Sequence, residues 1–115
     1  MIKIKRIYDA ADDKDGFRVL VDRLWPRGVK KEDAIFDLWA KAIAPSTELR
    51  QWYDHKHERW DEFQLRYRLE LTQADAMAEL ASLRAAAKKG TVTLLTATRN
   101  ETENHAVFLQ KLLSR

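Results

Sequence analysis

The sequence predicts an α/β fold, with a small three-layer sheet of about three main strands flanked by helices. Short apolar runs occupy residues 2–7, 17–24 and 91–98. Between the second and third runs, apolar residues recur at helical spacing over a long central region. Strand-like runs that alternate with helical segments are typical of α/β domains.

Length and composition limit the class of protein further. The chain has 115 residues, of which 45% are hydrophobic, and we assign residues 1–115 to a single domain. Its longest apolar stretch is far shorter than the ~20 residues that cross a bilayer, and no apolar signal segment is visible at the start. The chain has no cysteine, which excludes disulfides and thiol nucleophiles and fits a reducing compartment. We therefore expect a cytoplasmic protein that does not associate with membranes.

The charges are mixed along the chain. There are 21 basic and 18 acidic side chains, which gives a net charge of +3. No run of Lys and Arg marks a nucleic-acid-binding arm. This pattern predicts a solvated surface of mixed charge, and it is compatible with a local basic pocket for an anionic ligand.

The first strand is predicted at residues 2–7, where Ile2 and Ile4 alternate with lysines. A polar connector follows and ends in the turn signal Asp15-Gly16. The connector is shorter than the crossover of about a dozen residues that parallel neighbours usually need. The residues alone therefore leave a hairpin between the first two strands as an open alternative.

The second strand is predicted at residues 17–24. It is ended by Trp25-Pro26-Arg27-Gly28, because Pro26 holds Trp25 extended and Gly28 permits a turn. Residues 32–42 carry apolar side chains at near-helical spacing, which predicts a short amphipathic helix there.

Ser46 predicts the start of the next helix, because its side chain can cap free backbone amides. A helical stripe then runs from Trp60, and a helix-end signal follows at Lys88-Lys89-Gly90. The pattern does not decide whether residues 72–75 divide this region into two helices.

Residues 91–98 predict the third strand, which is rich in threonine and leucine. The last helix follows it. Two capping-box-like pairs offer a start for this helix, either Thr98 with Glu101 or Asn100 with Glu103.

Unusual polar residues gather after the second and third strands. In open α/β sheets, ligands bind beyond the carboxyl ends of the strands, and a helix that begins there offers amides to an anion. We expect the ligand-binding residues to be Arg23, Trp25, Arg27, Arg99, Asn100 and Asn104. Asp22 and His105 are the candidate catalytic residues, as groups that move protons.

Each of these residues also has a purely structural interpretation. Asp22 and Arg23 can form an internal ion pair, Trp25 can be a core residue, and Asn100 can be a helix cap. His55 and His57 are two residues apart and would point to different faces of a helix, so we predict no metal site. No Walker loop or dinucleotide fingerprint is present, so we predict no cofactor.

Four stretches of the sequence are similar to a known family. They are residues 15–28, residues 44–50, the Trp60/Phe63/Tyr67 spacing with Glu70-Leu71, and Thr93-Leu94-Leu95 leading to Asn104-His105-Ala106. Together they resemble the YeaO-like branch of the domain-of-unknown-function 488 family. The resemblance implies a small cytosolic bacterial protein with a mostly parallel sheet whose strand ends gather at one site.

The broader family often carries a cysteine near the end of the third strand and a Cys-His-Arg triplet at the following helix. Thr96 and Asn104-His105-Ala106 stand at the matching positions here. Chemistry that depends on a thiol is therefore not expected, and the resemblance itself implies no reaction.

The residues predict a pocket for a small anionic ligand that contains a phosphate group or is a nucleotide. Hydrolysis and group transfer are the reaction classes that such a pocket suits. The alternative is a non-catalytic module that uses the same basic face to bind nucleic acid or a partner protein. The sequence alone predicts neither whether the protein is an enzyme nor its oligomeric state.

Overall fold

The sheet of the protein has four strands, all paired in parallel in the order β1-β4-β2-β3. The computed structural model describes residues 1–115. Its strands are β1 (Ile2–Arg6), β2 (Phe17–Leu20), β3 (Leu38–Trp39) and β4 (Val92–Thr96). The α/β class and the parallel sheet are as predicted, with four strands rather than about three.

β4 lies between the first two strands. Val92 of β4 pairs with Ile2 on one side and with Phe17 on the other. β1 and β2 therefore do not form a hairpin, and their connection passes over β4. Gly16 ends this connection with a φ of 64°, and a Cβ atom there would lie 2.2 Å from the carbonyl oxygen of Thr91. Only glycine fits this close approach.

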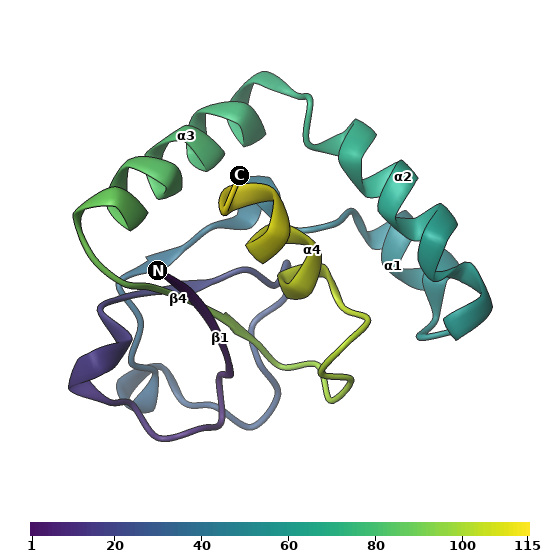
Figure 1. Cartoon of the computed structure of the whole chain (residues 1–115). Helices are drawn as coiled ribbons and strands as arrows, with labels where there is room; N and C mark the ends of the chain where they lie inside the picture. The colour runs from purple at the N-terminus through teal and green to yellow at the C-terminus, as the bar shows by residue number, and fades with distance from the viewer.

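All four α-helices lie on one face of the sheet, as Figure 1 shows. They are α1 (Thr47–Tyr53), α2 (Trp60–Glu70), α3 (Ala74–Lys89) and α4 (His105–Leu113). The third layer, on the opposite face, consists of the β1–β2 and β2–β3 connections, which contain the short 3₁₀ turns η1 (Asp13–Asp15) and η2 (Lys31–Asp33). None of the helices is long and apolar enough to cross a membrane.

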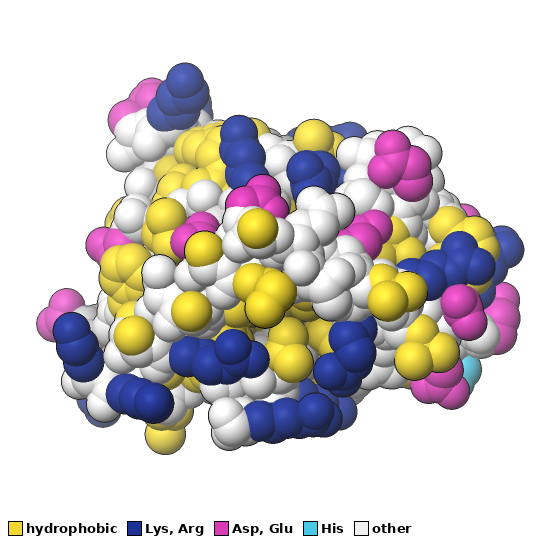
Figure 2. Space-filling model, turned by 90° about the horizontal axis from the view of Figure 1, so that it is seen from above, with side chains coloured by type: hydrophobic (Ala, Val, Ile, Leu, Met, Phe, Trp, Pro, Cys, Tyr) yellow, Lys and Arg dark blue, Asp and Glu magenta, His cyan; other side chains and the backbone are white.

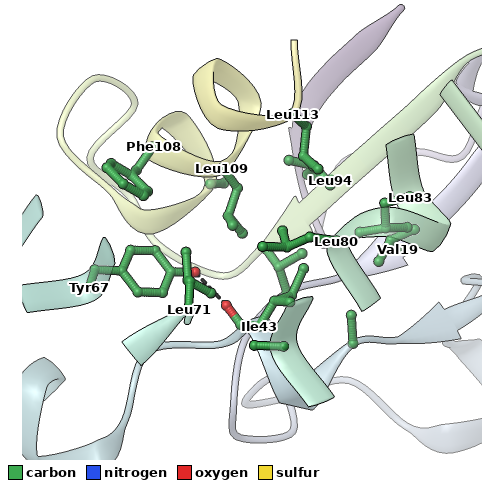
Figure 3. Close-up of a cluster of buried hydrophobic side chains, with 14 of the residues drawn as sticks. Val19, Ile43, Tyr67, Leu71, Leu80, Leu83, Leu94, Phe108, Leu109 and Leu113 are labelled. Atoms are coloured by element: carbon green, nitrogen blue, oxygen red, sulfur yellow. Dashed lines mark hydrogen bonds between the residues drawn. The ribbon is translucent and has the colours of Figure 1, made fainter. Parts of the chain in front are cut away.

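The main core fills the space between the sheet and the helices. Figure 3 shows side chains from β2, β4, α3 and α4 meeting there, namely Val19, Leu94, Leu80, Leu83, Leu109 and Leu113. Tyr67 of α2 is fully buried in this core and donates a hydrogen bond to the carbonyl oxygen of Ile43. Burial of the ring and the nearby charge of Glu70 raise the pKa of Tyr67 well above its usual value.

The opposite face of the sheet holds a buried ionic cluster. Asp15 lies 3.0 Å from the Nζ atom of Lys5 and also pairs with the guanidinium of Arg18. Burial alone would raise the pKa of Asp15, but hydrogen bonds from Lys5, the Asp12 amide and Arg18 outweigh it and hold the pKa below its usual value. The cluster anchors the β1–β2 connection to the sheet.

The helix predicted at residues 32–42 is wrong. This region contains η2, the edge strand β3 and a second 3₁₀ turn, η3 (Lys41–Ile43). Arg18 of β2 holds the segment just before β3 at several points, which places the strand beside β2. The Asp37 amide donates to the carbonyl of Arg18 at 2.8 Å, and the Arg18 amide donates to the Asp37 carboxylate at 2.8 Å. The Arg18 side chain also binds the carbonyl of Ile35 at 2.6 Å.

Several element boundaries also differ from the prediction. β2 ends at Leu20 rather than at residue 24, although the Val21 amide still donates to Leu95 at 3.0 Å. β4 ends at Thr96, and the open question at residues 72–75 is settled by a break between α2 and α3.

The predicted cap of the last helix is also wrong. Asn104, not Thr98 or Asn100, caps α4, and its Oδ1 atom accepts a hydrogen bond from the Val107 amide at 3.0 Å. Asn100 instead forms a local turn, in which its side chain accepts from the amides of Thr102 and Glu103.

The outer surface of the helical layer carries mixed side chains. Figure 2 shows exposed hydrophobic side chains on this face interspersed with basic and acidic ones. The most exposed of the large hydrophobic residues on α2 and α3 are Leu65, Leu69 and Met77. This face matches the mixed-charge surface expected from the composition.

Candidate functional site

A cavity of about 580 Å³ lies at the carboxyl ends of β2 and β4. Its walls come from the segment after β2, the loop between β4 and α4, the end of α1, and Tyr8 from the β1–β2 connection. Because β2 and β4 are neighbours in a parallel sheet, both strand ends deliver their polar residues to the same edge.

Asp22 joins the walls of the cavity. Its Oδ1 atom lies 2.7 Å from Nε2 of His105 and accepts a hydrogen bond from the Thr96 hydroxyl at 2.7 Å. Its Oδ2 atom accepts from the Ala97 amide at 2.8 Å. One carboxylate therefore ties the segment after β2 to both the end of β4 and the start of α4.

The environment of Asp22 favours its ionised form. Burial would raise the pKa of Asp22, but the hydrogen bond and charge of His105 and the bonds from Ala97 and Thr96 outweigh it. The pKa of Asp22 therefore lies below its usual value. Asp22 does not pair with Arg23, so the internal ion pair considered from the sequence is absent.

Three arginines line the cavity without a carboxylate partner. The guanidinium of Arg23 donates to the carbonyls of Pro45 at 3.0 Å and Ala44 at 3.1 Å, which leaves its charge uncompensated. Arg27 and Arg50 also line the cavity and take part in none of the protein's ion pairs. Such uncompensated guanidinium groups favour an anion.

Three carboxylates also line the cavity, and two of them are already bonded. Asp22 binds His105, and Glu103 binds His57 at 2.7 Å. Asp54 is the one lining carboxylate without a partner. The charges that stay open to a ligand are therefore mainly positive.

Arg50 was not predicted from the sequence. It lies on α1, whose start is fixed by Ser46, because the Ser46 hydroxyl accepts from the Leu49 amide at 3.1 Å. Arg50 is three residues before Tyr53, which also lines the cavity, so the two share one side of the helix. This spacing from Tyr53 is the one sequence signal for Arg50, and it becomes informative only once Tyr53 is known to face the cavity.

Trp25 forms a wall of the cavity and is held in place on several sides. Its indole N–H donates to the carbonyl of Val29 at 2.6 Å. Its ring lies 5.5 Å from that of Trp39 in an edge-to-face arrangement and 5.8 Å from that of Phe36. Trp25 is thus both packed and partly open to the cavity.

The remaining predicted residues have different positions. Asn104 lines the cavity, but its side chain is buried. Its polar atoms already cap α4 and donate a hydrogen bond to the carbonyl of Asn100. Arg99 is exposed, and neither it nor Asn100 lines the cavity. The structure thus brings together Asp22, Arg23, Trp25, Arg27, Asn104 and His105, but leaves Arg99 and Asn100 outside.

Thr98 adds a polar group that was considered from the sequence only as a candidate helix cap. Its Oγ1 atom is the one buried side-chain oxygen or nitrogen in the protein without a hydrogen-bond partner. Thr98 lines the cavity, so a bound ligand or water can satisfy this hydroxyl.

A short hydrogen-bond network includes two residues that line the cavity, Tyr53 and Glu103. The Tyr53 hydroxyl donates to the carbonyl of Glu103 at 2.8 Å, and the Glu103 carboxylate lies 2.7 Å from Nδ1 of His57. Burial and the charge of Glu103 raise the pKa of Tyr53, and the hydrogen bond to Glu103 raises the pKa of His57. The network joins the end of α1 to the loop before α4.

No group of three or more His, Asp or Glu side chains is placed to hold a metal ion. His57 binds Glu103 outside the cavity wall, whereas His55 lines the cavity. The site therefore offers guanidinium, hydroxyl and aromatic groups to a ligand.

Comparison with known proteins places this chain in a family. The model of the family described as "Inactive DUF488-N3 subclade" matches residues 1–115. The uncharacterized protein Rv3073c of Mycobacterium tuberculosis is 46% identical over 113 residues, which cover 98% of this chain and 93% of the relative. The uncharacterized protein YeaO of Escherichia coli is 46% identical over 109 residues, which cover 94% of this chain and 92% of the relative. No solved structure matches significantly. The chain belongs to the DUF488 family, as a YeaO-like member.

Proposed function

We propose that the cavity binds a small anionic ligand that carries a phosphate group, and that it does so without chemical turnover. The observation that supports this most is the set of three arginines without carboxylate partners, Arg23, Arg27 and Arg50, around one cavity. Guanidinium groups suit phosphate because their planar donors match its oxygens.

Two observations support binding without turnover. The family model that matches the whole chain is described as inactive. Both carboxylate oxygens of Asp22 are occupied by Thr96, Ala97 and His105, so Asp22 serves as a structural anchor between the strand ends.

A second candidate function is hydrolysis or group transfer, and the 2.7 Å contact between Asp22 and His105 favours it. In that case Asp22 orients the imidazole, and His105 takes a proton from an attacking water or hydroxyl group. Release of inorganic phosphate from phosphate esters, lost in His105→Gln, would support this candidate over simple binding.

Thermal-shift and calorimetric titration with inorganic phosphate and a panel of phosphorylated metabolites test the proposal. We expect stabilisation of the wild type, a loss of at least about tenfold in affinity for Arg27→Ala and Arg50→Ala, and little change for Arg99→Ala. Arg99 is the matched control, because it is an exposed arginine outside the cavity. No stabilisation, or equal affinities in all four proteins, would refute the proposal.

The nucleic-acid alternative makes a different prediction. Binding to single- or double-stranded DNA or RNA would weaken steeply with salt, because bound counterions are released. Salt-sensitive gel shifts with nucleic acid, together with no response to small phosphates, would favour that alternative.

A further inference from the structure

The cavity has an apolar side as well as a basic one. Tyr8, Leu24, Trp25 and Pro26 line it together, and three of the four are consecutive in the segment after β2. Leu24 is 60% exposed and Tyr8 is 46% exposed. Two large apolar side chains left open beside a cavity are available to contact a ligand.

Tyr8 is fixed next to the basic side. Its hydroxyl donates to the carbonyl of Arg27 at 2.9 Å, and the guanidinium carbon of Arg6 lies 4.8 Å from the centre of its ring. The backbone that carries the Arg27 guanidinium therefore also holds the Tyr8 ring. The Tyr8 ring is therefore held next to the backbone of Arg27, whose side chain is proposed to bind the anion.

Trp25 gives the apolar side a rigid part. Its hydrogen bond to Val29 and its contacts with Phe36 and Trp39 restrict the indole ring. A ring held in this way loses little conformational entropy when a flat group packs against it.

The size of the cavity also points beyond a simple anion. About 580 Å³ lies within the range of roughly 300–1,000 Å³ typical of small-molecule sites, and inorganic phosphate fills a small part of it. Gln51 and Asp54 add an amide and a free carboxylate to its lining, which suit the polar edge of a heteroaromatic ring.

We infer that the ligand is a nucleoside monophosphate or a close analogue, with its phosphate at Arg23, Arg27 and Arg50 and its base against Tyr8, Leu24 and Trp25. This inference rests on the proposed function and adds the part of the ligand that the arginines do not explain. Stacking of a base on an aromatic side chain is sequence-tolerant, so the apolar side recognises a base in general.

Calorimetric titration of the wild type with the four ribonucleoside monophosphates, ribose 5-phosphate and inorganic phosphate tests the inference. We expect at least one nucleotide to bind about tenfold or more tightly than ribose 5-phosphate, which has the same anionic group but no base. Quenching of tryptophan fluorescence by the nucleotide, and not by ribose 5-phosphate, would report contact with Trp25.

Variants of Tyr8 separate the two halves of the ligand. Tyr8→Phe and Tyr8→Leu both lose the hydroxyl bond to Arg27, but only Tyr8→Phe keeps the ring. Compared with Tyr8→Phe, Tyr8→Leu is expected to bind the nucleotide about tenfold more weakly and ribose 5-phosphate equally well. Phe17→Leu is the control, because Phe17 is a partly exposed aromatic residue that does not line the cavity.

The outcomes distinguish this inference from the proposed function. The inference would be overturned, and anion binding left standing, by equal affinities of the wild type for nucleotides and ribose 5-phosphate. The same conclusion would follow if Tyr8→Leu, compared with Tyr8→Phe, lost affinity equally for both. Absence of binding by all six compounds would remove the proposed function and the inference with it.

Discussion

Replacing Asp22 with asparagine tests the link between the strand ends and α4. The carboxylate receives hydrogen bonds from the Thr96 hydroxyl, the Ala97 amide and His105, at 2.7, 2.8 and 2.7 Å. Asparagine keeps an oxygen for the Ala97 amide, and the Thr96 hydroxyl can turn to accept. The loss is therefore concentrated at His105. Because hydrogen bonds to charged groups contribute about 1.5–3 kcal/mol, we expect the free energy of unfolding to fall by about 2 kcal/mol at pH 7.

The same substitution predicts a pH dependence with a definite sign. The pKa of Asp22 is lower in the folded protein than the usual value of about 3.9 expected after unfolding. Its contribution to stability is therefore present above that usual value and is lost as the pH falls through the folded-state pKa. The difference in the free energy of unfolding between the wild type and Asp22→Asn should therefore decrease below about pH 4.

Urea unfolding followed by the fluorescence of the four tryptophans provides the assay, at pH 7, 5 and 3. Asp54→Asn is the matched control, because Asp54 lines the same cavity without a partner. We expect it to change the free energy of unfolding by less than about 0.5 kcal/mol. The reasoning is refuted if Asp22→Asn is as stable as the wild type at pH 7, or if the difference is the same at pH 3.

Two further predictions concern stability and use the same urea assay. Gly16→Ala should cost about 3 kcal/mol or more, because of its positive φ and a Cβ atom 2.2 Å from the Thr91 oxygen. Gly28→Ala should lower the free energy of unfolding by only about 1 kcal/mol, because φ is also positive, at 80°, but no atom lies within 4 Å of the added Cβ. Equal losses of stability in the two variants would contradict this account. Ser46→Ala should lower the free energy of unfolding by about 1–2 kcal/mol, because it removes both the cap of α1 and the hydrogen bond from the Ser46 hydroxyl to Glu70. A loss no larger than that of Thr47→Ala, at the exposed first position of the helix, would argue against both contributions.

Local signals in the sequence were sufficient for much of the fold. Ser46 predicted the start of α1, and Lys88-Lys89-Gly90 predicted the end of α3, because capping depends on residues within one turn. The first strand was predicted from alternation over a few residues, which the structure confirms as β1.

Long-range contacts decided what the sequence did not show. The apolar spacing in residues 32–42 predicted a helix. The contacts of Arg18 in β2 with Ile35 and Asp37 instead hold this segment beside the sheet, where Leu38 and Trp39 form an edge strand. For the last helix, Asn100 and Asn104 both carry capping side chains. Which of the two caps α4 depends on how the loop packs against the rest of the protein, and the neighbouring residues in the sequence do not determine this.

The part of the candidate site that lies at the strand ends could be predicted from the sequence. Residues after β2 and β4 could be placed together once the strands were taken as parallel neighbours. Arg50 and Thr98 needed the structure for different reasons. Arg50 depends on how α1 is positioned against the sheet, and Thr98 is notable only because its buried hydroxyl lacks a partner.

The central position of β4 affects how the protein is made. β1 and β2 both precede β4 in the chain, and the strand that lies between them is missing until residues 92–96 have been synthesised. Before that point, β2 can pair only with the two-residue edge strand β3. Until then both strands expose open edges, which favour pairing with other chains. A nascent or truncated chain that stops before β4 therefore cannot join β1 to β2 and complete the sheet. Whether the nascent chain aggregates therefore depends on how quickly residues 92–96 are synthesised.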